Sequence, residues 1–106
     1  MDQVLKLLGL GQRARSVVSG DEGVRAKLER RQARLVIIAA DAAPATQQDF
    51  SALSRRFGVP FVLFGAKAEL GAALGKSPRA VVTILDQHLA RRILGCLQEP
   101  SQQSQG

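Results

Sequence analysis

The stretch "SGDEGVRAKLERRQARLVIIAAD", Ser19–Asp41, joins a helix start to a buried strand and decides the fold. Its second half, "RLVIIAAD", is a nearly continuous apolar run of strand length, which is typical of a central strand covered on both faces. Ser19 and Glu22 match the S-x-x-E capping box, so a helix is expected to start there and to end near Arg31. A helix followed by such a strand predicts an α/β domain.

Helical and strand patterns alternate on both sides of this stretch. Helices are expected at about 2–12, 46–57, 67–74 and 86–97, and strands at 16–18, 61–64 and 80–85. Asp86 is expected to cap the last helix. Because parallel strands need helical crossovers, the pattern predicts an α/β fold: a three-layer α/β/α sandwich with a mixed sheet of about four strands.

The length of 106 residues suits one hydrophobic core. Residues 1–98 are expected to form a single domain, and residues 99–106 a flexible polar tail with nothing to bury. Cys96 is the single cysteine and can form no internal disulfide. With no signal peptide and no apolar run of membrane-spanning length, we expect a cytoplasmic protein that does not contact a membrane.

Positive charge is concentrated in one part of the chain. The formal net charge is +6, and residues 11–34 carry seven cations against three acids, a balance of +4. Eleven of the fifteen cations are Arg, whose planar guanidinium suits phosphate groups and guanine edges. The clustering favours a polyanionic partner over a merely solvated basic face. The only aromatics are four Phe between Phe50 and Phe64, so binding by a surface row of stacked rings is not expected.

The helix that follows Gly20 is the candidate binding site. Four backbone N–H groups at a helix start lack intrahelical acceptors, and the helix dipole adds positive potential there. Gly20 and Gly23 would let another backbone come close. Asp21 and Glu22 would repel a phosphate but could accept hydrogen bonds from base N–H groups. Nucleic acid with base edges at the helix start fits this combination; the alternative is that Ser19 and Glu22 only cap the helix.

Catalytic and cofactor signals are weak. "GLGQRA", Gly9–Ala14, matches a loose dinucleotide loop, but a helical pattern precedes it and no acid follows on the next strand, so a helix that ends in a basic hinge is preferred. His88 has no predictable nucleophile beside it, and Cys96 is expected to be a small buried thiol. One His and one Cys make no metal site. We expect no catalytic residues, no metal, no cofactor and no enzyme activity.

Three segments, "SGDEGVRAKLERRQARLVIIAADA", "GVPFVLFGAKAELGAALGK" and "RAVVTIL", resemble the kink-turn RNA-binding ribosomal protein superfamily (L-seven-Ae type). More narrowly, the chain is similar to the bacterial YlxQ-like branch, where "LLGLGQRARSVVSG" corresponds to the opening helix and basic hinge. The resemblance covers about residues 3–97. It implies a single RNA-binding domain that recognises and stabilises kinked, structured RNA without catalysis, with ribosomal or ribosome-associated RNA as the natural target.

The resemblance also implies which residues meet the RNA. In the family a glycine-started helix enters the widened groove at a sharp RNA bend, and Gly20 takes that position. The family's usual Asn falls on Glu22, its usual Glu on Gly23 and its usual Lys on Ala26. Glu22 can accept from a guanine N–H but cannot donate as Asn does. A cation must then come from Arg25 or Lys27.

A loop that covers a flipped-out nucleotide in the family falls on Gly75–Arg79. Phosphate contacts around the helix start are expected to supply most of the affinity. The expected RNA-binding residues are Arg13, Arg15, Gly20, Asp21, Glu22, Gly23, Arg25, Lys27, Lys76 and Arg79.

The expected partner is structured RNA, bound by a monomer, and two alternatives stay open. A protein–protein interaction module on the same fold would be favoured if acids covered the basic face, or if the region from Phe50 to Phe64 formed an exposed apolar patch. A small nucleotide-binding enzyme would be favoured by a nucleotide in a pocket next to Gly9–Ala14.

Overall fold

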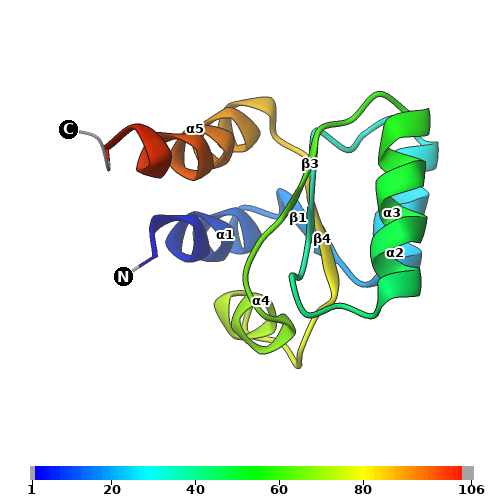
Figure 1. Ribbon diagram of the computed structural model, residues 1–106, viewed down its shortest axis with the longest axis horizontal. Coiled ribbons are helices and arrows are strands. Elements are labelled where there is room, and N and C mark those ends of the chain that lie inside the picture. Colours follow the sequence, from blue (N-terminus) through cyan, green and yellow to red (C-terminus); the bar gives the residue numbers. More distant parts are fainter. Residues whose placement is uncertain (1, 104–106) are drawn as a thin grey trace.

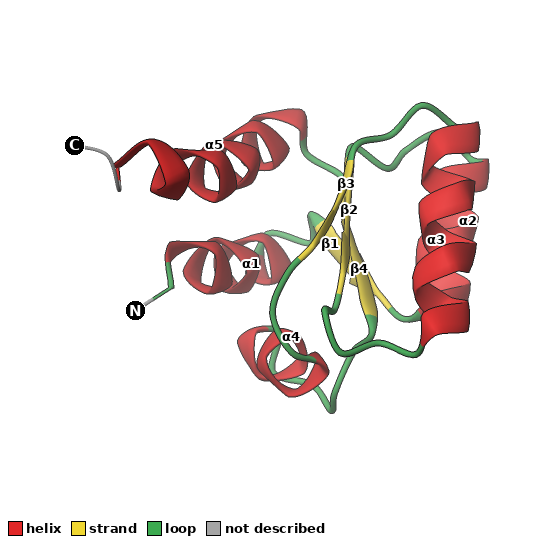
Figure 2. Cartoon of the chain, viewed as in Figure 1, coloured by secondary structure: helices red, strands yellow, loops and turns green. Residues whose placement is uncertain are grey.

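Helices cover both faces of a central sheet (Figure 1). The computed structural model describes the backbone of residues 2–103 and the side chains of residues 2–97. One face carries α2 (Asp21–Glu29) and α3 (Pro44–Arg56); the other carries α1 (Gln3–Arg13), α4 (Lys67–Ala73) and α5 (Gln87–Gln103) (Figure 2). The predicted three-layer α/β/α sandwich is confirmed.

The sheet is mixed and has four strands within the described residues. The strands β1 (Val17–Ser19), β2 (Leu35–Ile38), β3 (Phe61–Leu63) and β4 (Val81–Ile84) lie in the order β1-β4-β2-β3. Strand β4 runs antiparallel to β1 and β2, whereas β2 and β3 are parallel and are joined through α3. This crossover is the connection that the alternating sequence pattern predicts.

The two central strands form the middle of the core. Every residue of β2 and β4 is buried, as expected for strands covered on both faces. The hydroxyl of Thr83 donates a hydrogen bond to the Leu35 carbonyl at 2.8 Å, so this buried polar group is satisfied. Leu8 from one helical layer and Phe50 from the other are fully buried against the sheet.

Several element boundaries differ from the expected ones. Helix α3 begins at Pro44 rather than near residue 46, because proline suits a first helical position, where no N–H is needed. Helix α5 begins after Asp86, which accepts a hydrogen bond from the His88 N–H at 2.9 Å as predicted. It continues to Gln103, past the expected end at about residue 97 and into the tail predicted at 99–106. Residues 104–106 lie outside the described residues.

The predicted capping box at Ser19 and Glu22 is wrong. Ser19 is the last residue of β1 and pairs with Val82, so its backbone belongs to the sheet. Gly20 is the N-cap residue of α2, with φ of 94°, and no side chain caps this helix. Strand pairing therefore fixes Ser19 one position too early to cap, and the first turn of α2 is left open.

Candidate nucleic-acid interface

The start of α2 presents free backbone N–H groups. The Gly20 N–H donates to the Val81 carbonyl at 3.0 Å, and the first helical bond runs from the Val24 N–H to the Gly20 carbonyl at 3.0 Å. The N–H groups between them belong to Asp21, Glu22 and Gly23, and no side chain caps them. Asp21 and Glu22 are also exposed. Free donors and the positive end of the helix dipole make this turn a site for hydrogen-bond acceptors.

Glycine is needed at two positions of this turn for different reasons. A Cβ atom on Gly20 would meet nothing within 4 Å, so its requirement comes from the positive φ alone. A Cβ atom on Gly23 would lie 2.7 Å from Cγ1 of Val18. Gly23 thus lets α2 approach β1 closely, which explains a glycine where the resemblance places a Glu.

The loop Gly75–Arg79 lies at the same end of the sheet as the α2 start. It leads into β4, whose Val81 accepts the Gly20 N–H, and the Arg79 N–H donates to the Lys67 carbonyl at 3.0 Å. A Cβ atom on Gly71 would clash with the Ser77 carbonyl, so the loop packs directly on α4. The structure therefore brings the predicted covering loop and the predicted helix start together.

Arg79 has an unusual feature for a surface loop. Its Nε atom is buried and has no hydrogen-bond partner among the described residues, while the side chain as a whole is half-exposed. Lys76, on the same loop, is exposed. An unsatisfied buried donor is uncommon in folded proteins and calls for an acceptor from water or a ligand.

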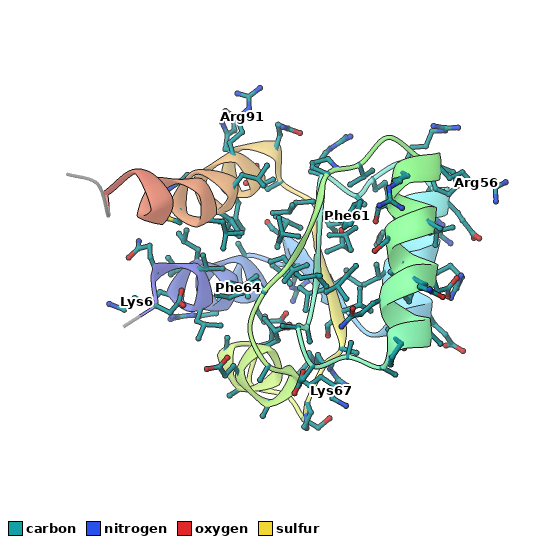
Figure 3. All side chains as sticks on the ribbon, in the orientation of Figure 1. Lys6, Arg56, Phe61, Phe64, Lys67 and Arg91 are labelled. Carbon is teal, nitrogen blue, oxygen red and sulfur yellow. The ribbon has the colours of Figure 1, made fainter. Side chains whose placement is uncertain are left out.

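Lys67, which lies at the same end of the sheet as the α2 start, was not among the RNA-binding cations predicted from the sequence. Its N–H donates to Oδ1 of Asp41 at 2.8 Å, which ties the start of α4 to the loop after β2. Figure 3 shows Lys67 at the end of the sheet where α4 begins. The signal was present, because Asp41 and Lys67 follow two strands, β2 and β3, that are parallel neighbours and end at one edge.

Three other cations predicted to bind RNA lie farther from the α2 start. Arg13 and Arg15 precede β1, and Gly20 follows it, so a strand of about 10 Å separates them. Lys27 lies in the last turn of α2, where its Nζ is 3.1 Å from Oε1 of Gln32. The basic cluster of the sequence is therefore divided between different parts of the fold.

Arg25 faces the neighbouring helix. Its Nη2 lies 2.7 Å from Oδ2 of Asp49 on α3, and its guanidinium lies 5.0 Å from the ring centroid of Phe50. The hydrogen bond that Arg25 donates to Asp49 is the main cause that raises the pKa of Arg25, so the group stays cationic. This ion pair is the one found among the side chains of residues 2–97, so acids do not cover the basic residues in general.

The region from Phe50 to Phe64 forms no broad apolar patch. Phe50 is buried, and guanidinium groups lie over the rings of Phe57 and Phe61. Leu63 is the exposed large apolar residue of this region, at 54% of its accessible surface. Neither condition that would favour a protein-interaction module is met by these side chains.

The segment Gly9–Ala14 does not form the phosphate-binding loop that a nucleotide-binding enzyme would need. A cavity of about 240 Å³ lies beside Gly11 and Ala14, and Leu7, Leu10 and Leu89 contribute to its lining. Residues 9–13 are helical, so their N–H groups are used within α1 and cannot cradle a pyrophosphate. His88, at this cavity, is exposed.

The described residues contain no group of three His, Cys, Asp or Glu side chains placed to bind a metal ion. Cys96 is half-exposed rather than buried as expected. None of the helices within residues 2–103 combines the length and the apolar character needed to cross a membrane.

The fold and this site define a class: small α/β/α sandwich proteins with an uncapped, glycine-started helix beside a basic loop. The chain belongs to the ribosomal protein L7Ae/L30e/S12e/Gadd45 family, whose sequence profile matches residues 2–93. The family resemblance read from the sequence is thereby confirmed.

Two curated relatives carry the name "RNA-binding protein YlxQ", which agrees with the predicted branch. The one from Bacillus subtilis (strain 168) is 35% identical over 91 residues, which cover 86% of this chain and 91% of the relative. The one from Enterococcus faecium is 30% identical over 90 residues, covering 85% and 86% of the two chains.

Solved structures show the same fold. A Bacillus halodurans protein, described as having unknown function, superposes with a TM-score of 0.89 at 30% identity and covers 93% of this chain and 100% of its own. The "15.5kD RNA binding protein" of Giardia lamblia superposes with a TM-score of 0.76 at 28% identity, covering 90% and 88%.

Proposed function

We propose that this protein binds structured RNA without catalysis and stabilises a kinked, internally looped form of it. The observation that carries the proposal is the open first turn of α2 beside the basic loop Gly75–Arg79. The RNA-binding names of the two bacterial relatives and of the Giardia protein support RNA as the ligand. A monomer in the cytoplasm, acting on ribosomal or ribosome-associated RNA, completes the proposal.

Asp21 and Glu22 determine which part of the RNA faces the helix start. Their charges oppose a phosphate on the helix axis, whereas their carboxylates accept hydrogen bonds from base N–H groups. A guanine edge exposed at an internal loop offers such donors, and a regular duplex buries them in base pairs. The free N–H groups of Glu22 and Gly23 can donate to base or sugar acceptors nearby.

The cations bind the phosphate backbone on either side. Lys76 and Arg79 lie at the same end of the sheet as the α2 start and cover the RNA there, with Lys67 adjacent to them. Arg13, Arg15 and Lys27 contact phosphates of the flanking stems. Arg25 joins them only when its ion pair with Asp49 opens.

The protein bends RNA by binding its bent form more tightly than its straight form. A protein shifts an RNA from a straight to a bent form only by the difference between its affinities for the two forms. A hundredfold difference corresponds to about 2.7 kcal/mol. The open α2 turn supplies that difference, since it fits base edges that only the bent form exposes.

An equilibrium titration tests the proposal. Two RNAs of equal length are compared: one with tandem sheared G·A pairs at an internal loop, and one with Watson–Crick pairs in their place. We expect the chain to bind the first at least tenfold more tightly at one salt concentration. Equal dissociation constants would contradict the proposal, even if both RNAs bound.

A further inference from the structure

Four arginines gather at the other end of the sheet. They are Arg31, Arg34, Arg55 and Arg56, which we name the arginine surface. Arg31 and Arg34 line a cavity of about 430 Å³ together with Phe57, Pro60 and Gln87. It lies where β2 and β3 begin and β4 ends, opposite to the α2 start. Figure 3 shows Arg56 and Lys67 at different ends of the molecule.

The arginine surface is not neutralised. None of its four guanidinium groups lies within ion-pair distance of a carboxylate among the side chains of residues 2–97. The nearby carboxylate of Asp86 is engaged as the cap of α5. Like charges held together without counter-charges raise the local potential and attract anions.

Three of these arginines lie over phenylalanine rings. The guanidinium carbons of Arg31 and Arg56 lie 5.4 and 5.5 Å from the ring centroid of Phe57. That of Arg55 lies 5.1 Å from the ring centroid of Phe61. A guanidinium stacked on a ring uses its face, and its N–H donors remain free along the edge. The rings favour one placement of each guanidinium, and within the side chains of residues 2–97 none of the three donates a hydrogen bond.

Arg31 also occupies a position that normally takes glycine. Its φ is 60°, and the Gln32 N–H donates to the Lys27 carbonyl at 2.9 Å, which closes the end of α2. A left-handed residue at a helix end of this kind is most often glycine, because a Cβ atom is strained there. An arginine in this position brings a side chain to the cavity at the expense of backbone strain.

We propose that the arginine surface is a second RNA-binding site that takes phosphates of the RNA backbone. A guanidinium edge matches two phosphate oxygens, and a cavity lined by Arg31 and Arg34 admits a phosphate from solvent. Helix α2 has nine residues, so about 14 Å separates its two ends. The site reads no bases and does not require a kink. RNA bound at the α2 start can extend to it, or a second RNA can occupy it.

Two variants test this site, with a charge-matched control. Arg31→Gly removes the guanidinium and relieves the backbone strain, so the variant should fold at least as well as the parent chain. Arg34→Gln neutralises the second arginine. Lys6→Gln is the control, because Lys6 is exposed on α1 and Figure 3 shows it at the opposite side of the molecule from Arg56.

Binding to a long straight duplex and to a long kinked RNA is measured over a range of salt. We expect each arginine variant to reduce the slope of log K against log salt by about 0.9 on both RNAs, while Lys6→Gln leaves it unchanged. Crosslinked peptides should include residues 31–34. Unchanged slopes, together with crosslinks confined to the α2 start, would overturn the proposal.

The salt titrations distinguish failure of the second site from failure of kink recognition. If the parent chain binds straight and kinked RNA equally but Arg31→Gly lowers both slopes, the second site stands and kink recognition falls. If kinked RNA is preferred but neither arginine variant changes any slope, the second site falls. Titration with RNA of known length gives the stoichiometry, which distinguishes one extended RNA from two.

Discussion

Arg25 and Asp49 join α2 to α3 through an ion pair, with 2.7 Å between Nη2 and Oδ2. The side chains are 39% and 51% exposed, so the pair stabilises the fold by less than about 1 kcal/mol. Its larger consequence concerns RNA. A guanidinium that already binds a carboxylate and lies over Phe50 is less available to a phosphate than the sequence suggests.

We therefore expect Arg25→Gln to change the salt dependence of RNA binding by less than one phosphate contact. The free energy of unfolding in urea should fall by less than about 1 kcal/mol. Asp49→Asn is the matched variant: it frees Arg25 and should tighten RNA binding. A slope reduced by a full contact in Arg25→Gln would mean that Arg25 leaves Asp49 for the RNA.

Gly20→Ala should weaken both the fold and the preference for kinked RNA. Gly20 has φ of 94° and ψ of 155°, a region essentially restricted to glycine, so a residue with a Cβ atom costs about 1–3 kcal/mol there. Gly58→Ala is the control, because Gly58 has φ of 68° and equally open surroundings at the far end of α3. Both variants should be less stable in urea than the parent chain, Gly20→Ala at least as strongly as Gly58→Ala, and only Gly20→Ala should lose the kink preference. If both variants kept the same preference for kinked RNA, Gly20 would not be part of the RNA-binding site.

Glu22→Ala should reduce the preference for kinked RNA by about tenfold or more, since a charge-assisted hydrogen bond to a base contributes about 1.5–3 kcal/mol. Because Glu22 does not cap α2, only its favourable charge at the helix start is lost, at about 0.3–1 kcal/mol of stability. Binding and urea unfolding measure the two effects separately. A kink preference that survives the substitution would show that Glu22 does not contact a base.

Arg79→Met should weaken RNA binding without weakening the fold. Methionine keeps the apolar stem and removes a buried Nε that has no partner, a group whose burial costs about 1–3 kcal/mol. The slope of log K against log salt should fall by about 0.9, and the melting temperature should not fall. A lower melting temperature with unchanged binding would assign Arg79 a structural role.

Local patterns predicted much of the fold correctly. The apolar run at Leu35–Ile38 is a central strand, and Asp86 caps α5, because burial and capping depend on residues close together in the chain. The cap expected at Ser19 is wrong because it depends on residues that are distant in the chain. Whether Ser19 ends a strand or starts a helix depends on its pairing with Val82, and these residues are far apart in the sequence.

The sequence indicates only part of how the candidate site is arranged. The α2 start and the loop Gly75–Arg79 were both predicted to contact RNA, which stays a prediction, and they lie at the same end of the sheet. Residues 11–34 form one basic cluster in the sequence, but α2 carries the last residues of this cluster to the opposite end of the sheet, where Arg31 meets Phe57. The partner of Arg25 lies 24 residues away, on α3. Such pairings follow from helix packing, which a single sequence does not specify.

The bend of a labelled RNA under equilibrium binding tests the central claim most directly. An RNA with tandem G·A pairs carries a fluorophore on each stem, under conditions in which about one-tenth of it is bent. With a hundredfold preference for the bent form, saturating protein should bring about nine-tenths of the RNA into the high-transfer state. An RNA that binds the protein fully but keeps its original energy transfer would contradict the claim that the α2 start selects kinked RNA.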